Sequence, residues 1–257
     1  MGDTLPNPRQ DFTAVAGEVA EQLQALDALR ERYRRELHAG AILPSVTEAT
    51  RIALTYNSNA IEGNTLTLRE TQLVLEGITP PGGKPLREIY EARNHDRALG
   101  YVEAIAKTDA PVNEAELLEV HRLVMTDIAD HAGRFRRGRV LIAGSGFVPP
   151  GAHRFDELIG ASLAAGNRAS LHPVLRSAEL HYNLVAIHPF EDGNGRTARL
   201  MMNRVALQAG YPHIVLEVAR RAEYLAALDR ANQGDVLSFA QFVIDSAIAS
   251  ARRMLGE

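Results

Sequence analysis

The residues best suited to chemistry lie in one segment, HPFEDGNGRTAR, at positions 188–199. His188 is the side chain of this segment that can accept a proton near neutral pH. Asp192 offers hard carboxylate oxygens, which suit a Mg2+ ion that bridges phosphates. Gly193 and Gly195 let the backbone turn tightly and approach a ligand.

A helical pattern follows the glycines, so the first amides of that helix point back into the turn without a partner in the helix. Free amides and the helix dipole together form an anion site, which phosphate commonly occupies. Arg196, Arg199 and Asn203 recur at positions i, i+3 and i+7 and place two guanidiniums on one helical face. A base, a metal carboxylate, an amide nest and an arginine pair are what in-line transfer from a nucleotide requires.

The elements that position this segment are expected to be mostly helices. Apolar spacing and capping signals predict helices over residues 15–37, 45–61, 67–77, 87–107, 113–129, 197–209, 221–231 and 239–254. Capping residues are expected at Ser45 with Glu48, at Thr67 with Glu70, and at Asn113. Short apolar runs on both sides of a glycine turn, over residues 139–148, predict a β-hairpin. The expected fold is therefore all-α with one β-hairpin.

Composition excludes several other classes of protein. The chain has 257 residues, 46% of them hydrophobic, and its apolar runs are too short to span a bilayer. It has no cysteine, which excludes disulfides and fits a reducing compartment, so a cytoplasmic location is expected. A net charge of -4 and 5% aromatic residues argue against nucleic-acid binding. No signal peptide and no membrane partner are expected.

Residues 188–199 resemble the core motif of the Fic family, HPFx(D/E)GNGRxx(R/K), at every defined position. The resemblance implies a helical Fic domain that transfers AMP from ATP to a hydroxyl of a Ser, Thr or Tyr on a target protein, which could include the chain itself. It implies that His188 deprotonates that hydroxyl and that Asp192 holds Mg2+ against the α- and β-phosphates. It places a Fic domain at residues 45–257, after an N-terminal helical extension at residues 1–44.

The resemblance also implies how the nucleotide is bound. The amides of Gly193, Asn194 and Gly195, with the Asn194 side chain, would seat the α- and β-phosphates. Arg196 would contact the β-phosphate and Arg199 the γ-phosphate. Phe190 would anchor the loop in the core. The predicted hairpin corresponds to the family's flap, which binds the target's backbone by strand addition; it comprises Val140, Leu141, Ile142, Ala143, Gly144, Ser145, Gly146 and Phe147.

A second match lies upstream of the core motif. Glu62 ends a predicted helix, where the dipole does not favour a carboxylate, so it is expected to have a cationic partner elsewhere. Ser58, Glu62 and Gly63 fit the family's inhibitory pattern (S/T)xxxE(G/N). The resemblance implies that Glu62 pairs with Arg199 and keeps ATP from binding productively. This places the chain in the group with an N-terminal inhibitory helix, at about residues 45–63.

Alternatives remain open at this stage. The same site could remove AMP from a modified protein, with Glu62 orienting a water, or it could transfer UMP, phosphocholine or phosphate. A non-catalytic binding module is a third reading, and the N-terminal helix leaves a homodimer open. His95 and Asp96 are expected to have a packing role rather than to bind a metal, and His181 to be a core histidine. A basic cluster is expected to brace the flap or to meet an acidic target; it consists of Arg134, Arg136, Arg137 and Arg139.

Overall fold

A computed structural model describes residues 9–142 and 146–257 of the chain. The helices have these bounds: α1 Ala20–His38, α2 Pro44–Ile61, α3 Leu68–Leu75, α4 Leu86–Ile105, α5 Glu114–Met125, α6 Phe155–Gly166, α7 Pro173–Ile187, α8 Asn194–Gln208, α9 Arg221–Asn232 and α10 Val236–Met254. Short 3-10 turns lie at Phe12–Val15, Ala152–Arg154 and Val218–Arg220. Within the described ranges, no helix is both long and apolar enough to cross a membrane. The expected all-helical class is confirmed.

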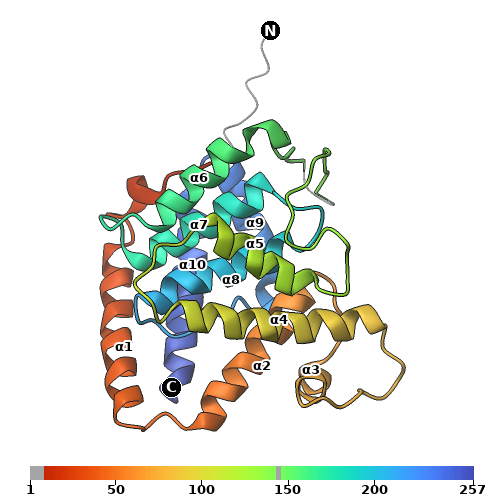
Figure 1. Ribbon diagram of the computed structural model, residues 1–257. Coiled ribbons are helices and arrows are strands. Elements are labelled where there is room, and N and C mark those ends of the chain that lie inside the picture. Colours follow the sequence, from red (N-terminus) through yellow and green to blue (C-terminus); the bar gives the residue numbers. More distant parts are fainter. Residues whose placement is uncertain (1–8, 143–145) are drawn as a thin grey trace.

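Helices α7 and α8 form the centre of the fold, and the other helices surround them (Figure 1). Most residues of α7 are buried, and they belong to two apolar clusters on opposite sides. One cluster joins α7 to α1, α9 and α10, and the other joins it to α4, α5 and α6. A helix that is apolar all round is stable only when neighbours cover every face. The loop between α7 and α8 comprises residues 188–193. Both ends of this loop are therefore fixed by helices of the packed core.

The described part of the N-terminal extension packs onto this same core. Phe12, Val15, Val19, Leu23 and Leu26 all lie in the cluster that contains α7 and α10. The segment before α1 is also bonded to α7, because the amide of residue 10 donates to the side-chain oxygen of residue 183 at 2.8 Å. The extension therefore supports the helix that leads into the motif.

The capping signals differ in how well they located helix ends. The reciprocal cap of Thr67 and Glu70 is present at α3, and Asn113 accepts the amide of Glu116 at α5. The predicted cap at Ser45 is wrong, since α2 begins with Pro44 as its first residue and makes no side-chain cap bond. Proline is favoured at that position because its missing N–H is not needed there.

The prediction of a β-hairpin is wrong for the described residues of this segment. Residues 139–142 and 146–150 contain no strand, while Ala143, Gly144 and Ser145 lie outside the described residues. Leu141 is 84% exposed. A two-stranded ribbon is only marginally stable alone, and Pro149 and Pro150 have no N–H for a ladder.

Candidate active site

His188 follows the last residue of α7 and turns the chain out of the helix. Its φ of 50° and ψ of 60° are left-handed, which is uncommon for a residue other than glycine. Its Nδ1 lies 3.3 Å from the Val185 carbonyl oxygen. A carbonyl only accepts, so Nδ1 carries the proton and Nε2 the lone pair. Burial lowers the pKa of His188, outweighing the carbonyl that raises it. His188 is therefore a neutral imidazole with a basic Nε2 at pH 7.

The loop after His188 is held closed by Asn194 and Phe190. The Asn194 Oδ1 accepts the Phe190 amide at 2.9 Å, and its Nδ2 donates to the Phe190 carbonyl at 2.9 Å. Phe190 is buried, as expected, and stacks on the ring of His121 with centroids 3.6 Å apart. Both polar atoms of the Asn194 side chain are thus engaged within the loop.

Arg136 braces the same loop from the side. Its Nε donates to the His188 carbonyl at 2.7 Å, and its Nη1 and Nη2 donate to the carbonyls of Gly138 and Pro150 at 2.6 and 2.7 Å. Its own amide donates to the Pro189 carbonyl at 2.9 Å. The buried Arg136 side chain therefore connects His188 to both ends of segment 138–150. For Arg136, the bracing expected of the basic cluster is confirmed.

Arg199 is held by the end of α2. Its Nε donates to the Ser58 hydroxyl at 3.0 Å, and its Nη2 donates to the Ser58 carbonyl at 2.8 Å and to Glu62 Oε1 at 2.7 Å. The Arg199 side chain is 5% exposed, and that of Glu62 is 41% exposed. Burial raises the pKa of Glu62, but the adjacent Arg199 guanidinium outweighs it and lowers the pKa overall. The cationic partner expected for Glu62 is therefore Arg199.

Gly195 lets this pair lie against the loop. A Cβ atom at this position would come within 2.1 Å of Glu62 Oε1 and 3.0 Å of Arg199 Nη1. No real Cβ contact is that short, so a side chain at 195 would force Glu62 away. Gly195 therefore allows both the tight turn and the close contact of Glu62 with the start of α8.

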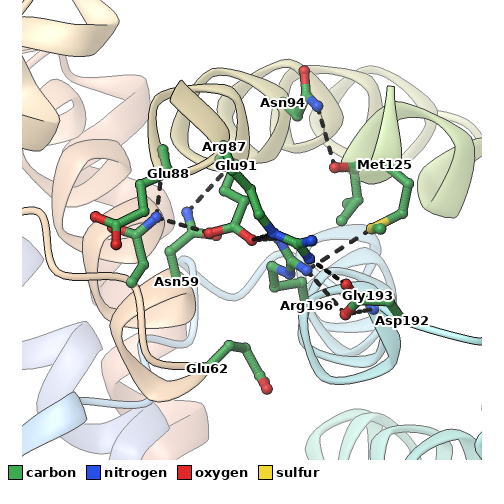
Figure 2. Close-up of polar contacts among 12 residues, drawn as sticks. Asn59, Glu62, Arg87, Glu88, Glu91, Asn94, Met125, Asp192, Gly193 and Arg196 are labelled. Atoms are coloured by element: carbon green, nitrogen blue, oxygen red, sulfur yellow. Dashed lines mark hydrogen bonds and ion pairs between the residues drawn. The ribbon is translucent and has the colours of Figure 1, made fainter. Parts of the chain in front are cut away.

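Asp192 and Arg196 form a ring of four charges with α4, shown in Figure 2. Asp192 Oδ2 lies 2.5 Å from Arg87 Nη2, and Asp192 Oδ1 lies 3.3 Å from Arg196 Nη2. Glu91 Oε1 closes the ring, 3.2 Å from Arg87 Nε and 3.2 Å from Arg196 Nη1. Burial raises the pKa of Asp192, but Arg196 and the Gly193 amide outweigh it, so this pKa is lowered.

Several donors at the start of α8 have no acceptor. Arg196 Nε and Nη1 and Arg199 Nη1 are buried without a hydrogen-bond partner, since the contact of Arg196 with Glu91 lacks hydrogen-bond geometry. The amides of residues 194–196 also bond to no other described residue, because the helical bonds begin at Thr197. Buried donors without acceptors cost free energy, and an anion with several oxygens would satisfy them.

A hollow of about 270 Å³ lies beside the end of α7. Its walls come from α7, α9 and both described sides of segment 142–147. One of them, Arg221, also donates through Nε to the carbonyl of Ile61, next to Glu62, at 2.7 Å. The hollow therefore adjoins both the His188 loop and the end of α2. It is lined by Ile142, Phe147, Tyr182, Val185, Ala186, Arg221, Leu225, Leu228, Asp229 and Asn232.

The other candidate residues have structural roles. His95 is fully buried beside the Thr55 hydroxyl, 3.1 Å away, and burial lowers its pKa to about 3. Asp96 pairs with Arg51 at 2.7 Å. His181 is buried in the core and stacks on Phe239, which agrees with the sequence-based expectation. Among the described residues, no three His, Asp or Glu side chains converge on a metal site.

Four residues of the site were not identified from the sequence. Arg87, Glu91 and His121 come from α4 and α5, and Arg136 was indicated only as one of a cluster. His121 accepts the Gly133 amide at Nδ1, 2.9 Å away, and donates from Nε2 to the Asp192 carbonyl, 3.1 Å away. The four-residue spacing of Arg87 and Glu91 suggests that they pair with each other. No sequence pattern indicates that they contact Asp192 and Arg196, which lie about 100 residues later.

Comparison with known proteins shows which family the chain resembles. Residues 111–206 match the model of the Fic/DOC family. Proteins named protein adenylyltransferase Fic from Drosophila persimilis and Drosophila erecta are 34% and 33% identical over 251 residues, which is 95% of this chain. These residues make up 48% and 50% of those proteins, so the chain spans about half the length of the curated relatives it matches.

Solved structures extend the likeness to the whole fold. Residues 134–508 of Fic-1 from C. elegans align with a TM-score of 0.82 and 32% identity, covering 95% of this chain and 73% of that one. A Fic family protein from Desulfovibrio desulfuricans G20 aligns with a TM-score of 0.75 and 32% identity, covering 91% and 74%. With its intact motif, its helical core and relatives of this similarity, the chain belongs to the Fic/DOC family.

Proposed function

We propose that the chain is a protein adenylyltransferase that transfers AMP from ATP to a hydroxyl of a target protein, and that Glu62 holds it in an auto-inhibited state. The observation that carries the proposal is the set of unpartnered donors of Arg196, Arg199 and the α8 amides, gathered at the start of α8, directly after the loop that begins with the neutral imidazole of His188. The relatives named protein adenylyltransferase support the same reaction.

The reaction follows from the roles that these residues can fill. Nε2 of His188 takes the proton from the target hydroxyl, whose oxygen bonds to the α-phosphorus. The bond from that phosphorus to the bridging oxygen breaks, and pyrophosphate leaves. Arg196 and the amides of residues 194–196 bind the α- and β-phosphates, and Arg199 binds the γ-phosphate. These contacts stabilise the charge that develops during transfer.

The carboxylate of Asp192 suits a magnesium ion. In nucleotide sites Mg2+ is commonly bound by one or two carboxylates together with phosphates, and Asp192 is half exposed beside the donors that phosphates would satisfy. When bound, Mg2+ supplies positive charge to the α- and β-phosphates. His121 holds the backbone of Asp192 through the carbonyl oxygen and so orients the carboxylate.

The hollow beside α7 fits the nucleoside, and segment 140–147 fits the target. Asp229 and Asn232 offer acceptors at the hollow for the exocyclic amine of adenine, and the apolar side chains of Leu225 and Leu228 can pack on its ring. Residues 140–142 form no strand, so their backbone is available to pair with an extended target peptide. Arg136 binds the carbonyls of Gly138 and Pro150, which flank this flap, and so fixes its flanks relative to His188.

Auto-inhibition by α2 rests on the Arg199 contacts. With Glu62 in place, Arg199 Nη2 is engaged and the Glu62 carboxylate lies against Gly195, where the phosphates would approach. A second carboxylate at this position is also what de-AMPylation would need to orient a water. Hydrolytic removal of AMP from a modified protein is therefore the second candidate, and its test is the release of AMP from AMPylated protein by the wild type.

The test uses Glu62→Gly, with and without His188→Ala, incubated with a cell lysate and ATP labelled at either the α- or the γ-phosphate. We expect label from α-labelled ATP on protein with Glu62→Gly, no label from γ-labelled ATP above that of the lysate alone, and loss of the added label in the double variant. Label from γ-labelled ATP alone would show phosphate transfer instead. If His188→Ala kept full transfer, His188 would not be the base.

A further inference from the structure

The two carboxylate oxygens of Asp192 have different surroundings. Oδ1 is turned into the loop, where it accepts the Gly193 amide at 2.5 Å and lies 3.3 Å from Arg196 Nη2. Oδ2 faces outwards and accepts a hydrogen bond from Arg87 Nη2 at 2.5 Å. Oδ2 has the fewer contacts and is therefore the oxygen that an incoming cation would bind. In this structure the Arg87 guanidinium already binds it.

Glu91 holds Arg87 in this position. Arg87 and Glu91 are one turn apart on α4, and Glu91 Oε1 accepts from Arg87 Nε at 3.2 Å. The opposite end of the guanidinium then reaches across to the α7–α8 loop, as Figure 2 shows. No bound ligand is needed for this arrangement, because the four charges alternate in sign around the ring.

A divalent cation on Oδ2 would lie directly beside this guanidinium. Mg2+ binds carboxylate oxygens at about 2.0–2.1 Å, and like charges at such short separations repel each other strongly. We propose that Arg87 is a latch on the metal ligand: it occupies Oδ2 of Asp192 in the resting protein, and it must move away before the metal–nucleotide complex can bind. This inference rests on the proposed role of Asp192.

The latch is separate from the contact between Glu62 and Arg199. It comes from α4 rather than α2, and it blocks the cation rather than the γ-phosphate. It is also weaker, because the side chains of Arg87 and Asp192 are 56% and 43% exposed. A half-exposed ion pair contributes little, so its removal should tighten metal binding by about two- to fivefold and not more.

The experiment measures Mn2+ binding by electron paramagnetic resonance, with an ATP analogue that has a methylene between its α- and β-phosphorus atoms. All variants carry Glu62→Gly, so that Arg199 is free. Arg87→Gln is compared with Arg93→Gln, which removes the same charge from an exposed position of the same helix. Asp192→Ala defines binding without the carboxylate.

We expect Arg87→Gln to lower the Kd for Mn2+ about two- to fivefold, Arg93→Gln to leave it unchanged, and the difference to shrink as salt rises. If Asp192→Ala abolished tight binding but Arg87→Gln left it unchanged or weaker, the latch would be wrong and Asp192 would keep its role. If Asp192→Ala left Mn2+ binding unchanged, the metal role of Asp192 would be wrong, and the latch with it.

Discussion

Two of the ion pairs that hold the motif of this protein differ in their surroundings. The Glu62–Arg199 pair has an arginine that is 5% exposed and that donates three hydrogen bonds to α2. The Arg87–Asp192 pair has both partners about half exposed and joins them by one hydrogen bond. Water and salt screen exposed charges, whereas a buried guanidinium depends on its partners. The first pair should therefore control activity and stability, and the second should only adjust metal affinity.

The largest effect expected is on the rate of transfer. Replacing Glu62 with Gly frees Arg199 for the γ-phosphate, and we expect the rate to rise on the order of ten- to a hundredfold, which is about 1.4 kcal/mol for each factor of ten. The measurement is the initial rate of AMP incorporation. Glu76→Gly is the matched control, because Glu76 also ends a helix immediately before a glycine but lies away from Arg199. A rate no higher than that of the control would contradict inhibition by Glu62.

A smaller effect is expected on stability, and it distinguishes the two pairs directly. Glu62→Gln leaves Arg199 buried without a countercharge, and we expect the free energy of unfolding at pH 7 to fall by about 1–3 kcal/mol. Arg87→Gln should lower it by less than about 1 kcal/mol. Urea denaturation measures both. Equal losses in the free energy of unfolding would contradict the expectation that the more buried pair contributes more to stability.

The stability contributed by the Glu62–Arg199 pair should depend on pH. The pKa of Glu62 is lowered in the folded protein, so the carboxylate stabilises the fold at pH values above its unfolded pKa, near 4.5. That contribution is lost as the pH falls through the lowered, folded pKa. The difference between wild type and Glu62→Gln should therefore be present at pH 7 and should shrink below pH 4.5.

The smallest effect concerns His188. Burial lowers its pKa, whereas the nearby carboxylates of Glu62 and Asp192 raise it. The acid limb of kcat/KM in Glu62→Gly should therefore have its midpoint below pH 6.5, with full activity above it, because the base must be neutral. In this variant only the Asp192 carboxylate remains to raise the pKa, so a midpoint above 6.5 would mean that it outweighs burial. A pH–rate profile at target concentrations well below KM checks this.

Local signals in the sequence were reliable where one residue acts on its near neighbours. The cap of Thr67 with Glu70 depends only on residues three positions apart, and it was confirmed. The cap at Ser45 was wrong, because the adjacent Pro44 suits the first helical position and moves the start of α2. Helix α6 was not predicted from the sequence. Its small residues allow close packing rather than mark a helix: a Cβ at Gly166 would lie 3.2 Å from Leu180.

The sequence by itself determined the motif, its glycine turn, the helix after it and the expectation that Glu62 needs a cationic partner. These depend on residue type and short spacing, which the chain carries directly. Only the tertiary structure decided which residues surround the motif: Arg87 reaches Asp192 and Arg136 reaches His188 across long stretches of chain. It also left residues 139–142 without strand structure. Such contacts depend on how helices pack, because side chains distant in sequence meet only when a shared core fixes the helices that carry them.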